Sequence, residues 1–259
     1  MVARSGLLRP ALVLATVGFL ANAVPAVASV PAVRQRVFPA LAGLGRTSHV
    51  ALTFDDGPDR ASTPRFLRLL AAARVRATFF VLGHMLDRDP GLGREIVAAG
   101  HEMAVHGWEH RNLLLRPPSA AYDDIARTRE RIAEITGSVP VWYRPPYGVL
   151  TVGALAACRR LYLTPRLWTA WGRDWRAGAT PASVYRTTTS SLSGGGTVLL
   201  HDSDCESHPG AWQATLGALP LLLAWAHDRH LTVGSLGEHD DSPGEGRDQE
   251  QPRCHRGEE

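Results

Sequence analysis

Short apolar segments alternate with amphipathic segments along most of this 259-residue chain, and this alternation constrains the fold more than any other feature of the sequence. The apolar segments are rich in β-branched and aromatic residues and are bounded by Gly, Pro or Asp, which is typical of strands. They cover residues 49–56, 77–83, 102–107, 141–148, 161–171, 196–202 and 230–236. Segments with helical spacing cover residues 62–75, 89–100, 119–137, 180–192 and 210–229. Because strand and helix alternate, the sequence predicts an α/β fold with a parallel sheet, either open or closed into a barrel.

The N-terminal residues carry the features of an export segment. Arg4 and Arg9 precede an apolar stretch without charged residues, and the small residues ending at Ala23 and Ala28 are typical of cleavage sites. We expect residues 1–28 to be a signal peptide or an uncleaved membrane anchor, with a buried helix as the remaining alternative. In either export interpretation the domain works outside the cytoplasm, as an extracellular, cell-wall or membrane-anchored protein.

Composition divides the rest of the chain. Residues 29–46 are predicted to be a linker, residues 47–238 a single globular domain, and the charged residues 239–259 a disordered acidic tail. All 28 basic residues are arginine, which excludes a Schiff-base lysine and the lysine of a phosphate-binding loop. The net charge is only +3, but acidic residues gather from Glu238 onward, so the body of the chain is basic. Solvated surface arginine accounts for this, and weak attraction to an anionic polymer is the alternative. We expect a monomer and no nucleic-acid partner.

The cysteines do not predict a metal site, because none of them lies in a C-x-x-C pattern. An exported protein allows one disulfide among the three cysteines. Cys158 with Cys205 is the pair to test, and Cys254 is then left over.

Polar and ionisable side chains stand where five of the predicted strands end. They are Asp55 and Asp56, His106 and His110, Arg144 and Tyr147, Asp174 and Trp175, and His201 and Asp202. In a parallel barrel the carboxyl ends of the strands meet on one face, where active sites lie. Solvation of a loop explains any single residue of this set but not the whole set, so the sequence predicts a functional site at this face.

Two adjacent carboxylates repel each other, and a cation between them would offset the repulsion. His106 and His110 have H-x3-H spacing, which brings two imidazoles to one side of a helix or a tight loop. Two neutral imidazoles and one carboxylate suit Zn²⁺ and leave positions open for water and substrate. The spacing alone is weak, but together with the paired aspartates it predicts a site for one divalent metal ion, with the second aspartate free beside it.

The segments "TFDDGP", "HGWEH", "RPPYG", "RDW" and "LLHD", in this order, resemble the five motifs of the polysaccharide deacetylase family (NodB-homology domain, carbohydrate esterase family 4). The resemblance spans residues 48–237, nearly all of the predicted domain. It implies a distorted, incomplete (β/α)7 barrel with parallel strands. It also implies metal-dependent removal of N-acetyl groups, or sometimes O-acetyl groups, from a glycan such as peptidoglycan or a chitin-like polymer.

The resemblance assigns roles to individual residues. Asp56, His106 and His110 match the metal ligands, for Zn²⁺ first and with Co²⁺, Mn²⁺ or Ni²⁺ as alternatives. Asp55 matches the general base, and Arg144 matches the arginine that pairs with that base.

The remaining roles follow in the same way. The backbone N–H of Tyr147 matches the oxyanion donor, and His201 matches the general acid with Asp174 as its partner. Trp175 matches a wall of the pocket, and Leu199 matches the residue that lines the acetyl-methyl pocket. The residues Trp168 and Trp171 are expected mainly as strand core, with stacking on a sugar as an alternative.

The sequence departs from the family pattern near the metal motif. Gly107 stands where Ser or Thr usually follows the first histidine, and Arg111 stands where Pro usually follows the second. The lost hydroxyl predicts altered metal affinity or ligand orientation. Arg111 and the inserted residues 203–212 are expected to border the cleft and to affect the choice of substrate.

Three alternatives stay open at this point. The chain is an amidase or deformylase acting on a non-polysaccharide amide with the same scaffold, or a non-catalytic glycan-binding module. A mononuclear iron oxygenase uses the same ligand types but fits the alternation of strands and helices poorly.

Overall fold

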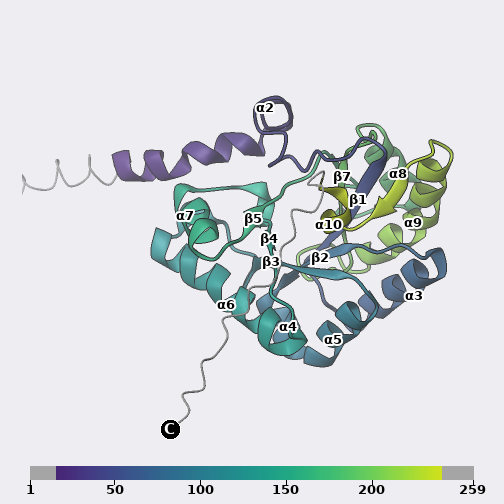
Figure 1. Cartoon of the computed structure of the whole chain (residues 1–259), viewed down its shortest axis with the longest axis horizontal. Coiled ribbons are helices and arrows are strands. Elements are labelled where there is room, and N and C mark those ends of the chain that lie inside the picture. The colour runs from purple at the N-terminus through teal and green to yellow at the C-terminus, as the bar shows by residue number, and fades with distance from the viewer. Residues whose placement is uncertain (1–15, 241–259) are drawn as a thin grey trace, which may run out of the picture.

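The computed structural model describes residues 16–240, and their strands form one sheet in which every neighbouring pair runs parallel (Figure 1). The strands are β1 (His49–Asp55), β2 (Thr78–Leu82), β3 (Glu102–Gly107), β4 (Trp142–Tyr143), β5 (Thr164–Pro165), β6 (Ala170–Trp171), β7 (Thr197–His201) and β8 (Thr232–Gly234). Their order across the sheet is β5-β4-β3-β2-β1-β7-β6, and β8 pairs with the beginning of β1. The curled sheet begins at β5 and ends at β6 without a pairing between these two strands in the described chain. This is the predicted incomplete barrel, which the structure confirms.

Helices cover the outer face of the curled sheet (Figure 1). They are α3 (Thr63–Ala73), α4 (Gly83–Arg88), α5 (Pro90–Ala98), α6 (Pro118–Thr136), α7 (Val152–Arg160), α8 (Pro181–Thr189) and α9 (Ala211–His227). Helix α2 (Pro31–Val37) lies apart from this layer, and α10 (Leu236–His239) packs through Leu236 against Ala51, Phe80 and Ala104. The five helices predicted from spacing appear as α3, α5, α6, α8 and α9. Their ends follow capping rules: Thr180 and Ser183 form a capping box before α8, and Gly137 ends α6 with φ of 70°. Residues 16–23 are helical as well, and three short 3-10 turns, Val24–Ser29, Leu113–Leu115 and Pro146–Gly148, complete the described helical elements.

Strand β1 lies at the centre of the core, because all seven of its residues are buried. It pairs with β2, β7 and β8. The Phe54 ring packs 5.3 Å from the ring of Phe66 on α3 and 5.1 Å from the ring of Phe79 on β2, measured between centroids. Burial on both faces is typical of a parallel sheet. This burial holds the end of β1 in place, and with it Asp55 and Asp56.

The predicted strand at residues 161–171 divides into two, which is why the structure has eight strands where seven were predicted. Pro165 has no N–H to continue a ladder. The next N–H, from Arg166, still donates to Tyr143 at 2.8 Å, but that of Leu167 donates to the carbonyl of Leu41 at 2.8 Å. The chain then joins β7, where the N–H of Thr169 donates to Thr197 at 3.0 Å.

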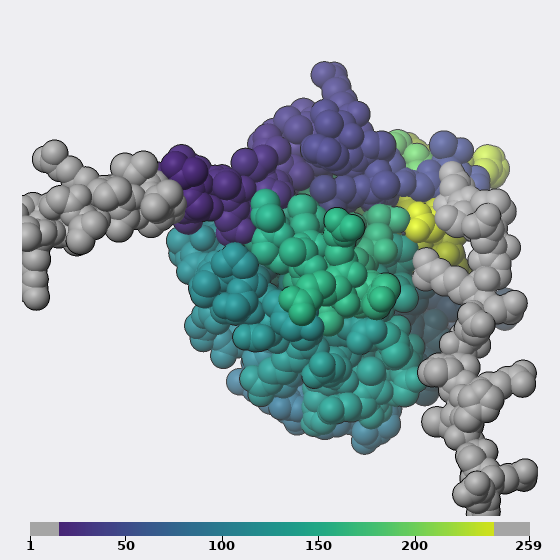
Figure 2. Space-filling view, turned by 60° about the vertical axis from the view of Figure 1, so that its left-hand side comes forward, coloured from purple at the N-terminus to yellow at the C-terminus, as the bar shows by residue number. Residues whose placement is uncertain are grey.

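Residues 29–46, predicted to be a linker, pack against the sheet. Helix α2 carries Arg34, which is 2% exposed and whose Nε donates to the carbonyl of Trp168 at 3.0 Å. The carbonyl of Gly43 accepts from Thr197 Oγ1 at 2.6 Å. With the Leu41–Leu167 hydrogen bond, these contacts place the segment along the gap between β5 and β6, and Figure 2 shows its purple and blue residues against the green surface. A chain segment thus lies where a closed barrel would have further pairing.

The other end of the domain also extends beyond its predicted limit. His239 is buried, and its Nε2 lies 3.2 Å and 3.1 Å from the carbonyls of Gly43 and Gly195. Asp240 forms an ion pair with Arg166 at 3.0 Å. Residues 241–259, which hold most of the predicted acidic tail, lie outside the described residues, as do residues 1–15 of the predicted export segment.

Within residues 16–240, no single helix is long and apolar enough to cross a bilayer. Thr16–Ser29 and Pro31–Val37 reach the required length and hydropathy only as a pair, and they are bent by 87° with respect to each other.

The suggested disulfide is not formed. Cys158 is a free thiol buried on α7, and Cys205 is a free thiol whose Sγ lies 3.8 Å from Nε2 of His84. Cys254 lies outside the described residues.

Candidate active site

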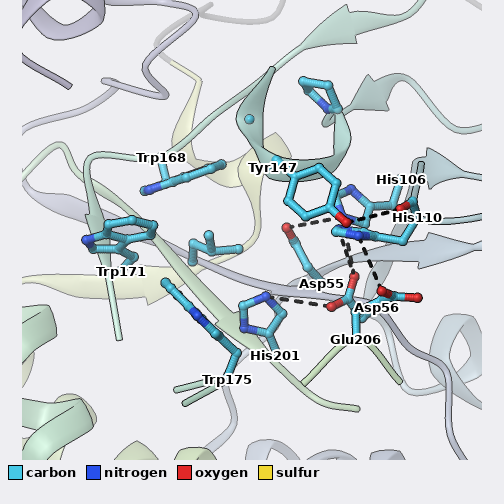
Figure 3. Close-up of a pocket in the computed structure, with 13 residues that line it drawn as sticks. Asp55, Asp56, His106, His110, Tyr147, Trp168, Trp171, Trp175, His201 and Glu206 are labelled. Atoms are coloured by element: carbon cyan, nitrogen blue, oxygen red, sulfur yellow. Dashed lines mark hydrogen bonds and ion pairs between the residues drawn. The ribbon is translucent and has the colours of Figure 1, made fainter. Parts of the chain in front are cut away.

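A cavity of about 240 Å³ opens where β1, β3 and β7 end, and it gathers most of the predicted site residues (Figure 3). Its lining consists of Asp55, Asp56, His106, His110, Pro145, Tyr147, Gly148, Trp168, Trp171, Trp175, Leu199, His201 and Glu206. Arg144 and Asp174 lie directly behind the lining, bonded to Asp55 and His201, and Asp202 is buried away from the cavity, where it accepts from the Thr63 hydroxyl. Figure 3 shows the carboxylates and imidazoles on one side and the three tryptophans on the other.

Both aspartates face this cavity because the backbone changes direction between them. Successive side chains of a strand point to opposite faces, so a regular strand would send one carboxylate away. Asp56 instead follows the last residue of β1 with φ of 74°, in the left-handed region that Asp tolerates better than most residues. Asp55 and Asp56 are 3% and 2% exposed, so two adjacent carboxylates are buried side by side.

The ligand atoms of Asp56, His106 and His110 converge, all lying within 4.8 Å of one another. Asp56 Oδ1 is 3.4 Å from His106 Nε2 and 3.7 Å from His110 Nε2, and it has no hydrogen-bond partner although it is buried. Ligands at about 2.0–2.2 Å from a tetrahedral Zn²⁺ are separated by roughly 3.3–3.6 Å. These three atoms are therefore spaced for a cation rather than for hydrogen bonds with one another.

Burial and the charges of neighbouring residues act on the pKa values of Asp56, His106 and His110, often in opposite directions. Burial alone would raise the pKa of Asp56, but the adjacent imidazole of His106 and the charges of His201 and His110 lower it to about 2. Burial, together with the charge of His106, lowers the pKa of His110 to about 4, so this imidazole is neutral as a ligand must be. Burial would also lower the pKa of His106, but Asp55 and Asp56 raise it. A divalent cation in place of the proton on His106 would add one further positive charge beside the two buried carboxylates.

The orientation of His106 is fixed by a neighbouring strand. Its Nδ1 lies 2.8 Å from the carbonyl of Arg144, to which an N–H at this position donates, so Nε2 is turned toward Asp56. The ring of His110 packs edge-on against the Tyr147 ring at 4.5 Å between centroids. Such outer contacts fix the tautomer and ring direction of ligating imidazoles.

Asp55 is held by a buried arginine. Arg144 is 0% exposed and its guanidinium donates to Asp55 Oδ1 at 2.6 Å and to Thr53 Oγ1 at 2.8 Å. Its other nitrogens donate to the carbonyls of Arg166 and Leu167. Every side of the guanidinium is thus bonded. Oδ1 of Asp55 is fixed, while Oδ2 faces His106 Nε2 at 3.8 Å.

His201 is clamped by Asp174 at two points. Asp174 Oδ1 lies 2.9 Å from His201 Nδ1, and Asp174 Oδ2 accepts from the His201 backbone N–H at 2.8 Å. Thr215 on α9 donates to the same Oδ2 at 2.6 Å. Burial would lower the pKa of His201, but the charge and hydrogen bond of Asp174 raise it to about 10. The imidazole is therefore protonated at neutral pH, with Nε2 directed to the cavity, 3.8 Å from Asp56 Oδ2.

The opposite wall is aromatic and aliphatic. Trp168 and Trp171 stack at 5.9 Å between ring centroids, and Trp171 contacts Trp175 at 5.0 Å. Leu199 on β7 is buried with Trp168 in one apolar cluster. Trp168 and Trp171 both line the cavity; Trp168 is also buried in the core, whereas Trp171 is only partly buried, and stacking on a sugar stays a prediction.

Gly107, which stands where the family usually has Ser or Thr, lies against the carboxylate of Asp124 on α6. Gly107 has φ of 120°, and a Cβ at this position would lie 2.8 Å from Oδ2 of Asp124. The same oxygen accepts from the backbone N–H of Trp108 at 2.9 Å. A carboxylate therefore occupies the space that a side chain at residue 107 would enter, and it holds the loop between the two histidines.

The other expected departures have different outcomes. Arg111 does not line the cavity; its side chain is exposed and pairs with Glu109. The inserted residues do border the cavity through Glu206, whose Oε2 lies 3.7 Å from His110 Nδ1. Glu206 was not predicted as a site residue. The signal for it was the insertion after His201, which indicated the cleft without indicating which residue faces it.

Comparison with known proteins places this geometry in a family. A family profile described as "Polysaccharide deacetylase" matches residues 44–165. A peptidoglycan-N-acetylglucosamine deacetylase of Listeria monocytogenes is 34% identical over 59% of this chain, but the match covers only 32% of that longer protein. A chitooligosaccharide deacetylase of Rhizobium leguminosarum bv. trifolii is 33% identical over 73% of this chain and 90% of its own length.

A solved structure shows the same fold. The family 4 carbohydrate esterase of Streptomyces lividans, solved with acetate, superposes with a TM-score of 0.65 at 28% identity, covering 73% of this chain and 93% of that one. Sequence and fold agree on the relationship, and the chain belongs to the polysaccharide deacetylase family.

Proposed function

We propose that this protein is a metal-dependent hydrolase that removes acetyl groups from an N-acetylated glycan. The observation that carries the proposal is the buried set of Asp56, His106 and His110 at the mouth of the barrel, flanked by Asp55 and His201. Zn²⁺ suits one carboxylate and two imidazoles best, with Co²⁺, Mn²⁺ and Ni²⁺ as alternatives. The matched relatives named as peptidoglycan and chitooligosaccharide deacetylases support a glycan substrate.

A divalent cation bound by these three residues supplies Lewis acidity, which lowers the pKa of an adjacent water toward about 7. Asp55 is the general base in this proposal. Arg144 holds Oδ1 at 2.6 Å, so Oδ2 is left to accept the proton of the attacking water. Asp55 stays outside the ligand set, and its carboxylate is available for this transfer.

His201 is the general acid. It is protonated at neutral pH, and Asp174 holds Nδ1, so Nε2 is the atom that donates a proton to the leaving amine. Each such proton transfer contributes roughly 10²–10⁴-fold to the rate.

The acyl group is held by the rest of the cavity. The backbone N–H of Tyr147 is proposed to donate a hydrogen bond to the developing oxyanion, a contribution of about 3–4 kcal/mol in comparable sites. Leu199 and the tryptophan wall accept the acetyl methyl group and one face of the sugar. Apolar walls with a few directed polar groups are typical of such sites.

Acetate release with and without a chelator tests the proposal. The purified protein is assayed on N-acetylglucosamine oligomers, on peptidoglycan and on a formylated amide that is not a sugar. We expect acetate from the glycans only, loss of activity with chelator, and recovery with Zn²⁺.

His106→Ala should lose bound metal and activity together, whereas Asp55→Asn should keep the metal and slow the reaction by about 10²–10⁴-fold. Chelator-resistant acetate release, or metal retained by His106→Ala, contradicts the proposal.

A further inference from the structure

A second hollow of about 480 Å³ lies beside the active-site cavity. Its lining consists of Trp171, Arg173, Arg186, Thr187, Ser190 and Ser191. Trp171 lines both spaces, so the hollow adjoins the cavity at this side chain. The hollow belongs to the loop after β6 and to the end of α8, and none of its polar residues takes part in the site described above.

The hollow is positively charged and its charge is not neutralised. Within residues 16–240, no carboxylate oxygen lies within 4.0 Å of the guanidinium of Arg173 or of Arg186. Asp174 is the only acidic residue from 173 to 201, and it is 1% exposed and bonded to His201 and Thr215. Within residues 16–240, the two arginines are therefore exposed and neither pairs with an acidic group.

Arg173 places its positive charge next to Trp171, a residue of the cavity wall. Its guanidinium lies over the ring of Trp171, 5.1 Å from the ring centroid. This stacking orients the guanidinium while its N–H groups remain free to donate. The hydroxyl groups of Thr187 and Ser191 add further polar groups to the same hollow, whereas the Ser190 hydroxyl donates to the carbonyl of Thr187 at 2.8 Å. Guanidinium and hydroxyl donors together suit an anion with several oxygens.

We propose that this hollow is a subsite for an anionic oxygen group, a carboxylate or a phosphate, carried by a glycan on a sugar near the one that is deacetylated. The inference rests on the proposed function for the reaction at the neighbouring cavity. It narrows the substrate class from N-acetylated glycans in general to negatively charged ones. A neutral polymer would use the tryptophan wall alone and leave both arginines without a partner.

Matched oligosaccharides of equal length test this subsite. The set contains a neutral N-acetylglucosamine oligomer, the same oligomer with carboxylates on alternate sugars, its methyl ester, and a version with phosphates at the same positions. Affinity is measured by calorimetry in the presence of chelator, and acetate release is measured separately with metal. The binding measurement does not depend on turnover, so the subsite is tested even if no acetate is released.

The expected result is a charge-dependent preference that the two arginines create. Arg173→Gln and Arg186→Gln should each weaken binding of a charged oligomer about threefold, and the double variant about tenfold, since exposed ion pairs contribute modestly. Binding of the neutral oligomer and of the methyl ester should not change. Raising the salt concentration from about 50 to 500 mM should reduce the preference, because exposed charges are screened. Whether carboxylate or phosphate binds more tightly identifies the group.

The controls separate charge from folding. Arg176→Gln removes an exposed arginine that does not line the hollow, and it should bind every oligomer like the unmodified protein. Arg173→Lys keeps the charge and should restore part of the preference. Arg186 is exposed on α8, so its variant carries the test by itself if Arg173→Gln fails to fold.

Equal affinity for charged and neutral oligomers, or a preference that survives in the double variant, overturns the subsite. Absence of acetate from every substrate overturns the proposed function instead.

Discussion

At the scale of single residues, the loop that carries both histidine ligands is held by a carboxylate from elsewhere in the chain. Asp124 on α6 accepts from the N–H of Trp108 and fills the space beside Gly107. The absence of a side chain at residue 107 therefore leaves the space that the Asp124 carboxylate occupies. Burial raises the pKa of Asp124, which is consistent with a carboxyl group enclosed behind the loop.

Asp124→Ala should weaken metal binding by about 10- to 100-fold, the usual effect of losing a group that orients a ligand. The reason is that the turn between His106 and His110 loses its anchor. Metal affinity is measured by competition with a chromophoric chelator. Asp123→Ala is the matched control, since Asp123 is exposed on the same helix and should leave the affinity unchanged. Equal affinity in both variants would show that the loop holds its shape without Asp124.

Residues of this kind mark the limit of prediction from the sequence. Asp55, Asp56 and His201 were predictable because motif and strand end coincide. Asp124 carries no such signal: it is one of two adjacent aspartates on an amphipathic helix, and only the packing of α6 on β3 brings it to the loop. Glu206 was similarly hidden, since an insertion has no pattern that says which side chain turns inward.

At the scale of elements, periodicity and caps predicted the long helices and the central strands well. They failed for short elements. Helix α4 begins directly after β2, without the polar boundary that separates elements elsewhere. Helix α7 did have a signal, because Thr151 caps it by accepting from the N–H of Ala154 at 3.1 Å, but spacing alone did not reveal the helix.

The junction between β2 and β3 should make stability sensitive to acid. His101 is 5% exposed, and its Nδ1 accepts from the N–H of Ala77 at 3.1 Å. Burial and the charge of Arg76 lower its folded-state pKa to about 4. The unfolded chain takes up this proton near pH 6.5. The contribution of His101 is therefore complete above about pH 6.5 and is lost as the pH falls toward 4, at a cost of about 3 kcal/mol.

Urea unfolding at several pH values between 7 and 4 measures this effect. In His101→Asn the amide oxygen can still accept from Ala77 but does not titrate, so the free energy of unfolding should fall less steeply with decreasing pH. His227→Asn is the control, because the His227 side chain is 92% exposed. Identical pH dependence in the unmodified protein and in His101→Asn would exclude this histidine as a source of acid sensitivity.

At the scale of the whole molecule, the N-terminal segment is part of the folded domain. Pro, Arg and Gly made residues 29–46 resemble a linker, but Arg34, Leu41 and Gly43 bond to the edges of the open barrel. Composition alone could not reveal this, because the partners lie more than a hundred residues away in sequence. The parallel sheet was predictable from the repetition of strand and helix, whereas the incomplete barrel was implied by the resemblance to the family.

We propose that the chain is exported and that cleavage after Ala28 would leave this segment in place. The protein recovered outside the cell should then begin at Ser29, which N-terminal sequencing checks. A chain beginning at Thr47 should unfold about 5–10 °C lower than one beginning at Ser29, since it loses several buried contacts of roughly 1 kcal/mol each. Equal melting temperatures for the two chains would mean that the segment contributes nothing to the stability of the barrel.

The left-handed backbone of Asp56 has a consequence for how this site can change over time. Residues that adopt such a conformation easily, glycine and asparagine, carry no negative charge. Glutamate carries the charge, but it is longer and disfavours the conformation. Backbone and ligand chemistry thus demand the same amino acid for unrelated reasons. No single-step replacement meets both demands, so saturation mutagenesis should find this codon among the least permissive in the gene.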